Sequence, residues 1–149
     1  MEIQWLLKKF DELTPAELYA ILQLRNEVFV VEQNCVFQDA DDKDQASYHL
    51  MGWCNEKLVA YTRIVPAGVL YAETSIGRVV TSFSVRNNGV GKVLMQQSLA
   101  AVYKLFGKVP VRIGAQLYLK AFYESLGFEQ ASDVYLEDGI EHIYMAKGI

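Results

Sequence analysis

The stretch from residue 74 to residue 106 restricts most strongly how this 149-residue chain can fold. Residues 74–81 are rich in β-branched side chains and predict a strand. Residues 91–106 carry apolar side chains three and four positions apart and predict a helix. Between them lies the glycine-bearing turn Arg86-Asn87-Asn88-Gly89-Val90-Gly91. A strand that enters a helix through such a turn presents unpaired backbone N–H groups at the helix start.

This turn has the chemistry of an anion site. The partial positive charge at a helix N-terminus favours a phosphate. Gly89 and Gly91 lack the Cβ atoms that would keep a pyrophosphate from the backbone, and Arg86 adds a permanently charged, fork-shaped donor. A P-loop needs Ser or Thr where Val93 stands, and a dinucleotide fingerprint needs Gly where Leu94 stands. An ordinary Asn-Gly turn before a helix is the alternative interpretation.

The rest of the pattern predicts one mixed α/β (α+β) domain over residues 1–149, a length that suits a single core. Thr14 and Glu17 form a capping box around Pro15, and this helix is expected to run to about residue 31. A further helix is expected at 117–126, and the further strands are expected at 2–10, 47–54, 58–65, 109–115, 129–136 and 140–146. This order of elements predicts helices packed on a central sheet.

Charge and composition argue against several classes of function. The net charge is −4 with no cluster of Lys and Arg, so no nucleic-acid partner is expected. No apolar run approaches the roughly 20 residues that span a bilayer, and the start does not match a signal peptide. No membrane partner is therefore expected, and a cytoplasmic protein with reduced Cys35 and Cys54 is predicted. The acidic run 39–44 lacks the Gly and Glu of a calcium loop, so we expect a solvated loop and no metal.

Two motifs together resemble the GNAT acyltransferase superfamily. Arg86-x-x-Gly89-x-Gly91 matches the family signature Arg/Gln-x-x-Gly-x-Gly/Ala between a strand and a helix. Residues 116–128 look like the family's Asn-x-x-Ala-x-x-x-Tyr-x-x-x-Gly-Phe segment, loosely spaced and with Gln116 in place of Asn. Segments similar to the ElaA-like subfamily occur at 24–33, 63–68, 76–80 and 142–145. The resemblance therefore covers nearly the whole chain.

The resemblance implies a single GNAT-like domain whose central, splayed, mixed β-sheet is flanked by helices. It implies acetyl-CoA as co-substrate, wedged between two parallel strands that part. Strand residues 79–81 would then pair with the pantetheine arm, and residues 86–92 would hold the pyrophosphate. The cofactor-binding residues that it implies are Val79, Val80, Thr81, Arg86, Asn87, Asn88, Gly89, Val90, Gly91, Lys92, Gln116 and Tyr123.

The resemblance also implies catalytic roles. Tyr123 stands in the matching Tyr-x-x-x-Gly-Phe position as proton donor to the departing thiolate, and a tyrosine that merely packs against the helix is the alternative. In several members a general-base Glu aligns with Ser75, and a serine hydroxyl is too weak a base for that role. His142 and Glu32 are the candidate bases, each with a purely structural alternative. Glu32 and Gln33 are also the residues expected to hold the amine.

The implied function is acetyl transfer from acetyl-CoA to a primary amine by direct attack in a ternary complex. The acceptor is a small-molecule or peptide amine, and a homodimer is possible in this family. The alternative is a module that binds CoA or acyl-CoA without turnover. Tyr123 favours the enzyme, whereas the missing carboxylate at Ser75 favours the module.

Overall fold

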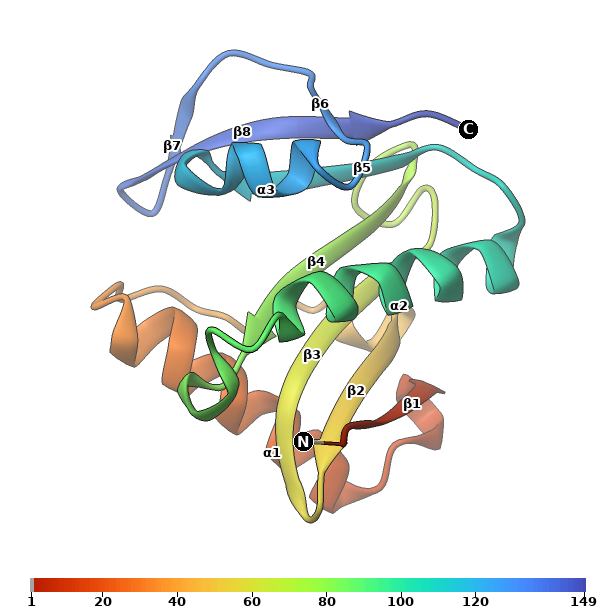
Figure 1. Ribbon diagram of the computed structural model, residues 1–149, viewed down its shortest axis with the longest axis vertical. Helices are drawn as coiled ribbons and strands as arrows, with labels where there is room; N and C mark the ends of the chain where they lie inside the picture. The colour runs from red at the N-terminus through yellow and green to blue at the C-terminus, as the bar shows by residue number, and fades with distance from the viewer. Residues whose placement is uncertain (1) are drawn as a thin grey trace.

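The computed structural model describes residues 2–149 and contains one mixed sheet with eight strands (Figure 1). The strands lie in the order β1-β2-β3-β4-β5-β8-β6, and β7 pairs with another part of β8. Their bounds are Gln4–Lys9 (β1), Tyr48–Cys54 (β2), Lys57–Val65 (β3), Thr74–Thr81 (β4), Val111–Gln116 (β5), Glu129–Gln130 (β6), Tyr135–Glu137 (β7) and Ile140–Lys147 (β8). The predicted hairpin of β2 and β3 is confirmed.

The sheet splays between β4 and β5, which form its parallel pair. These strands are paired at Thr74 with Val111 and at Ser75 with Arg112, and then diverge. Figure 1 shows the two strands parting toward the side where α2 begins. A bulge lies in β4, where Arg78 has a φ of 50° and the register with β3 shifts. Because a bulge bends its strand, it turns β4 away from β5. The predicted splayed mixed sheet is confirmed.

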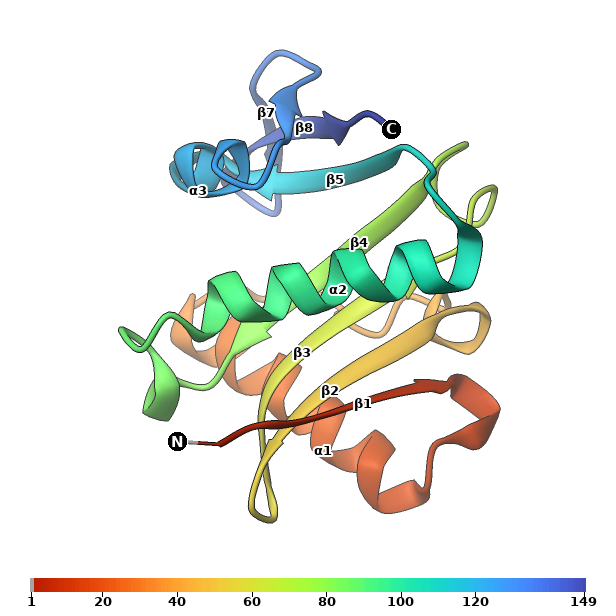
Figure 2. The ribbon, with the colours of Figure 1, turned by 45° about the vertical axis from the view of Figure 1, so that its right-hand side comes forward.

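Helices cover both faces of the sheet (Figure 2). α1 (Pro15–Arg25) and the π-helical turn η2 (Asn26–Glu32) pack through Ile21 and Leu24 on one face, in a cluster with Tyr61. α2 (Val90–Phe106) packs through Leu94 on the opposite face, in a cluster with Val59. The remaining helical elements are η1 (Phe10–Glu12), η3 (Asp44–Ala46), η4 (Phe83–Val85), η5 (Leu117–Leu119) and α3 (Lys120–Glu124).

Local signals place the starts of α1 and α2 to within one residue and misplace one strand. The α-helix expected over 117–126 is shorter, because residues 117–119 form the 3-10 turn η5 and α3 begins only at Lys120. The Thr14 hydroxyl accepts the Glu17 N–H at 3.1 Å, and the Glu17 carboxylate accepts the Thr14 N–H at 2.8 Å, which confirms the capping box. The strand predicted over 129–136 is wrong, because the chain leaves the ladder between β6 and β7. There the Ser132 hydroxyl accepts the Tyr144 N–H at 2.9 Å and replaces a backbone partner.

The acidic run 39–44 is not a solvated loop, which corrects the expectation from sequence. Asp39 and Asp44 are each 7% exposed. Arg25, which is fully buried, contacts Asp39 and Asp44 at 2.7 Å each. Arg63 contacts Asp44 at 3.0 Å and Asp41 at 2.7 Å. Burial alone raises the pKa of Asp41, but its hydrogen bonds and ion pair with Arg63 outweigh burial and lower that pKa to about 2.

This ion network ties the loop to the bulge in β4. Arg78 Nε lies 2.8 Å from an Asp39 carboxylate oxygen, and its Nη2 donates to the Asp39 carbonyl at 2.9 Å. The left-handed backbone of Arg78 is strained for a side chain with a Cβ. The two contacts to Asp39 therefore hold the bulge that opens the sheet.

His49 has a structural role within the fold, and the two cysteines are unpaired. His49 is fully buried, and its Nε2 donates to the Asp44 carbonyl at 2.9 Å. Its Nδ1 then accepts from the Tyr61 hydroxyl, 2.6 Å away. Cys35 and Cys54 are free thiols. No helix within residues 2–149 is long and apolar enough to cross a membrane, and the same residues contain no group of His, Cys, Asp and Glu arranged to hold a metal ion.

Candidate functional site

The gap between β4 and β5 brings the predicted cofactor residues to one place. Beyond Ser75, β4 keeps its pairing with β3 up to Thr81, while the edge that faces β5 has no ladder partner among residues 2–149. Val79, Val80 and Thr81 lie on this open stretch. The chain then turns through η4 and enters α2 at the mouth of the gap (Figure 2). An extended ligand in the gap would meet strand backbone first and the helix start next.

The start of α2 fits an anion. The first bond of the helix runs from the Val93 N–H to the Gly89 carbonyl, so the N–H groups of Val90, Gly91 and Lys92 have no acceptor within the helix. Gly89 has a φ of 72°, and a Cβ placed on it would meet nothing within 4 Å. At Gly91 the nearest atom to such a Cβ is 3.9 Å away. The backbone is therefore open to close approach, as pyrophosphate binding requires.

Arg86 and Glu32 contact each other, although sequence gave them separate roles. The two guanidinium nitrogens of Arg86 donate to the two carboxylate oxygens of Glu32 at 2.7 and 2.9 Å. Arg86 also donates to the Thr81 carbonyl at 3.1 Å. Both side chains are about one third exposed, at 34% and 31%. This contact joins the end of η2 to the glycine turn over residues 86–91. In this arrangement both carboxylate oxygens of Glu32 already accept hydrogen bonds.

Gln33, Gln116 and His142 continue from this pair along the same side of the molecule. The Gln116 side-chain amide donates to the Gln33 amide oxygen at 3.3 Å. Gln116 at the end of β5 is paired in register with His142 on β8. Figure 1 shows the end of η2, the start of α2 and the β7–β8 turn on one side of the molecule. The structure thus brings together Arg86 and the residues predicted to face the acceptor.

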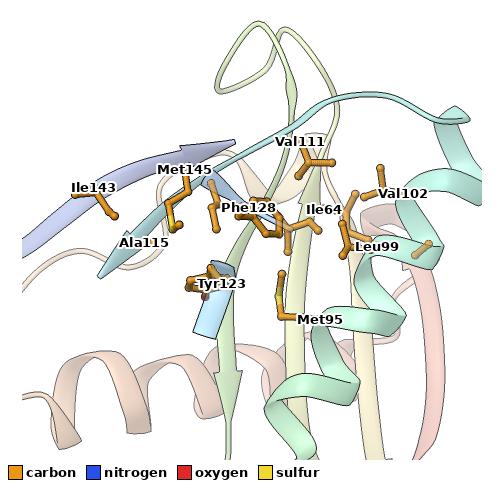
Figure 3. Close-up of a cluster of buried hydrophobic side chains, with 13 residues drawn as sticks. Ile64, Met95, Leu99, Val102, Val111, Ala115, Tyr123, Phe128, Ile143 and Met145 are labelled. Atoms are coloured by element: carbon orange, nitrogen blue, oxygen red, sulfur yellow. The ribbon is translucent and has the colours of Figure 1, made fainter. Parts of the chain in front are cut away.

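Tyr123 lies on the opposite face of the β5–β8 pair. It is 5% exposed and belongs to the cluster that contains Ala115, Met95 and Phe128 (Figure 3). Figure 3 shows it at the edge of that cluster, between Ala115 and Met95. Its hydroxyl makes no hydrogen bond to any residue in the range 2–149. Burial raises the pKa of Tyr123 and the nearby Tyr118 adds to the rise, so the phenol keeps its proton at neutral pH.

The two predicted proton-transfer groups therefore lie on different faces of the sheet. His142 projects from the face opposite to the core positions Ala115 and Ile143, whereas Tyr123 packs with those two residues. A ligand that passes through the gap between β4 and β5 can be reached from both faces.

Ser75, which aligns with the general-base position of several family members, lies at the closed end of the gap with Glu73 nearby. Ser75 is 2% exposed and pairs with Arg112 where β4 and β5 still touch. Glu73 lies 3.7 Å from the guanidinium of Arg112. Sequence reasoning missed Glu137, which lies 3.4 Å from His142 Nε2. The feature of the sequence that could have revealed Glu137 is the alternation along β7, which puts Tyr135 and Glu137 on the same face.

Comparison with known proteins agrees with this architecture. Residues 18–149 match the family described as "Acetyltransferase (GNAT) domain". The chain is 44% identical to protein ElaA of Escherichia coli strain K12, over 99% of this chain and 97% of that protein. It also matches a crystal structure of E. coli ElaA, with a TM-score of 0.92, 43% identity and coverage of 98% of this chain and 99% of that one.

A second solved relative is a protein from Pseudomonas aeruginosa described as an acyl-CoA N-acyltransferase. The TM-score is 0.95 at 42% identity, and the match covers 99% of this chain and 100% of that one. The family, the sequence relatives and the solved structures agree with the single mixed-sheet domain described above. This chain belongs to the GNAT acetyltransferase family, among relatives of ElaA.

Proposed function

We propose that this protein transfers an acetyl group from acetyl-CoA to a primary amine by direct attack in a ternary complex. The observation that carries the proposal is the divergence of β4 from β5 after two residue pairs, with the open start of α2 at the mouth of the gap. Family membership supports the acyltransferase class. An extended thioester with an anionic end fits a strand edge followed by a helix N-terminus.

Different residues of the chain bind the co-substrate and transfer the proton in this proposal. Strand residues 79–81 bind the arm of the co-substrate, and the backbone N–H groups of residues 90–92 bind its pyrophosphate. Acetyl-CoA supplies the activated thioester carbonyl. Tyr123, which is held neutral by burial, donates its proton to the departing sulfur. The gap orients the thioester so that an amine can attack from the face of His142.

The alternative is a module that binds CoA or acyl-CoA without turnover. The observation in its favour is the buried serine at position 75, where several family members have a general-base glutamate. Both functions need the phosphate turn, so cofactor binding does not separate them. Release of free thiol from acetyl-CoA with a panel of amines does, because the module releases none above the uncatalysed rate.

Cofactor binding is tested by thermal unfolding with acetyl-CoA, CoA and ATP. A ligand at about 100 times its dissociation constant stabilises the fold by about 2.7 kcal/mol. For a domain of this size, that corresponds to a rise in melting temperature of about 5–10 °C. We expect a rise with acetyl-CoA and with CoA and none with ATP. No rise with either CoA form, in folded protein at high ligand concentration, would contradict both functions.

The ion pair between Arg86 and Glu32 predicts that removing the charge of Glu32 strengthens the binding of CoA. The pyrophosphate and the Glu32 carboxylate compete for the same guanidinium, so Glu32→Gln is expected to tighten CoA binding. Since partly exposed ion pairs contribute up to about 1 kcal/mol, the dissociation constant should fall by about fivefold. Isothermal titration calorimetry with CoA measures it.

Glu27→Gln is the matched control for this measurement. Glu27 lies on the same helical turn and is exposed, with no ion pair among the described residues. We expect it to bind CoA as the unmodified chain does. Weaker binding by Glu32→Gln than by Glu27→Gln would show that Glu32 orients Arg86 for the cofactor instead of competing with it.

A further inference from the structure

Three arginines and three aspartates form a closed ring in which each side chain contacts two of the opposite charge. In order around this ion ring they are Arg25, Asp39, Arg78, Asp41, Arg63 and Asp44, which contacts Arg25 again. The six contacts are between 2.7 and 3.2 Å long. Their residues come from the end of α1, the acidic run 39–44, β3 and β4. The ion ring therefore fixes four separate segments relative to one another.

The ion ring holds both strands of the bulge in β4. Arg63 on β3 pairs in register with Gly77, and the ladder between β3 and β4 then skips residues 78 and 79. The left-handed φ of 50° at Arg78 is a strained conformation that persists only where the surroundings fix it. Asp41 contacts Arg63 at 2.7 Å and Arg78 at 3.2 Å, so it links the two strands across the skipped positions. The bulge lies just before the stretch of β4 that parts from β5.

Asp39 anchors Arg78 to the core. The Asp39 carboxylate lies 2.8 Å from Arg78 Nε, and its carbonyl accepts from Arg78 Nη2 at 2.9 Å. The same two groups of Asp39 contact Arg25, at 2.7 and 3.1 Å. Arg25 is fully buried at the end of α1, which packs on the sheet through Ile21 and Leu24. The bulge is thereby tied to a helix that is itself held in place.

Stability by itself explains the ion ring poorly. Arg25 and Arg63 are at most 1% exposed, and Asp39 and Asp44 are 7% exposed. Taking such charges out of water costs about as much as their attraction returns, so a buried ion network is often no more stabilising than an apolar core. Such a network can instead select one arrangement, because a shifted member leaves a buried charge without its partner. The arrangement that this ring selects includes the bulge.

We infer that Asp39 and Arg78 are positioning residues for acyl transfer, which hold the backbone of residues 79–81 where it meets the thioester. This inference rests on the proposed function and concerns how its site is kept in place. Neither side chain takes part in the transfer, since Asp39 acts through Arg78 and Arg78 acts through its own backbone. The thioester carbonyl gains negative charge during the attack, and a displaced N–H group stabilises that charge less. A displacement of about 1 Å can lower a rate about 100-fold.

Turnover of Arg78→Asn and Asp39→Asn tests this inference. Asparagine adopts a left-handed backbone readily, so Arg78→Asn permits the bulge and no longer fixes it to Asp39. We expect both variants to lower kcat for thiol release from acetyl-CoA by about tenfold or more. The dissociation constant for plain CoA should stay the same, because the pyrophosphate binds at the start of α2. The double variant should lose no more turnover than Arg78→Asn alone, since both changes break one contact.

Asp44→Asn is the matched control, because it makes the same chemical change in the same ring without touching Arg78. Within residues 2–149, the ion pairs of Asp44 are with Arg25 and Arg63. This variant should lose stability and keep the kcat of the unmodified chain, at a temperature where circular dichroism shows all variants folded. Equal kcat values for Arg78→Asn and Asp44→Asn would overturn the inference. Should Arg78→Asn not fold, Arg78→Lys replaces it with the same expectation, because lysine keeps the charge and lacks the fork that makes two contacts.

A binding measurement distinguishes this inference from the proposed transfer. Acetyl-CoA differs from CoA only by its acetyl group, so backbone amide NMR signals of residues 79–81 that differ between the two complexes report on the thioester. We expect these differences in the unmodified chain and in Asp44→Asn, and their loss in Arg78→Asn and Asp39→Asn. Their persistence in both latter variants would overturn the inference and leave the transferase function intact, as would their absence from the unmodified chain. The expected pattern in a protein that releases no thiol with any amine would support the inference and contradict the proposed transfer.

Discussion

An Asp44→Asn variant is expected to lose about 3 kcal/mol of unfolding free energy, because removing one partner of a buried ion pair leaves charge without compensation. Asp44 contacts Arg25 at 2.7 Å and Arg63 at 3.0 Å, and both arginines are at most 1% exposed. An amide keeps the size of the side chain and removes its charge. For a domain of this length the melting temperature should fall by about 6–12 °C. Urea unfolding followed by circular dichroism measures the free energy directly.

Asp42→Asn is the control for this variant. It makes the same chemical change two residues away, at an exposed position with a φ of 63°, which asparagine adopts readily. We expect a change within 0.5 kcal/mol, as is usual at the surface. Equal effects of Asp42→Asn and Asp44→Asn would mean that the buried network contributes nothing to stability.

The same network predicts how stability depends on acid. The pKa values of Asp41 and Asp44 are lowered in the folded state, because hydrogen bonds and ion pairs to arginine outweigh burial. A carboxylate with a lowered folded pKa contributes its full stability above its unfolded pKa of about 3.9 and loses it as the pH falls through its folded pKa. The unmodified protein should thus lose stability between about pH 4 and pH 2, and Asp44→Asn should lose less over that interval.

A Tyr123→Phe variant is expected to lower turnover about 100-fold while leaving the dissociation constant for CoA unchanged. Proton donation by a positioned side chain contributes at least this much to many enzymes. Phenylalanine keeps the ring that packs at 6.0 Å from Phe128 and 5.1 Å from Phe122, so the cluster should remain intact. Thiol release at saturating acetyl-CoA measures turnover, and calorimetry measures CoA binding.

Tyr103→Phe removes a hydroxyl from the last turn of α2, far along the chain from the glycine turn, and serves as the control. It should change neither turnover nor binding. If Tyr123→Phe turns over as fast as Tyr103→Phe, Tyr123 is a packing residue and the thiolate takes its proton from elsewhere. If Tyr123→Phe instead loses CoA binding, the tyrosine positions the co-substrate.

Much of the fold could be predicted because its signals are local. The capping box at Thr14 and Glu17 needs residues three apart, and it forms as expected. The β-branched side chains of β4 predicted its bounds of 74–81, and the apolar spacing of α2 placed that helix to within one residue. The glycine turn was visible for the same reason, since a glycine permits the left-handed backbone that Gly89 adopts, with a φ of 72°.

Contacts between residues that are far apart along the chain could not be predicted from the sequence. The acidic run 39–44 has the composition of a solvated loop, and nothing local shows that Arg25, Arg63 and Arg78 converge on it. The pairing of Arg86 with Glu32 joins residues 54 positions apart. The strand predicted over 129–136 failed because a side chain, the Ser132 hydroxyl, replaced a ladder partner.

The sequence by itself determined most of the strands and helices, the position of the glycine turn over residues 86–91, and that the pattern resembles one family. Those features depend on steric preferences and periodicity within a few residues. Only the tertiary structure decided that Tyr123 and His142 lie on opposite faces of β5 and β8, and that Glu137 stands beside His142. The physical reason is the splay itself. The bulge at Arg78, fixed by carboxylates from a distant loop, sets where the sheet opens and thus which side chains a ligand in the gap can reach.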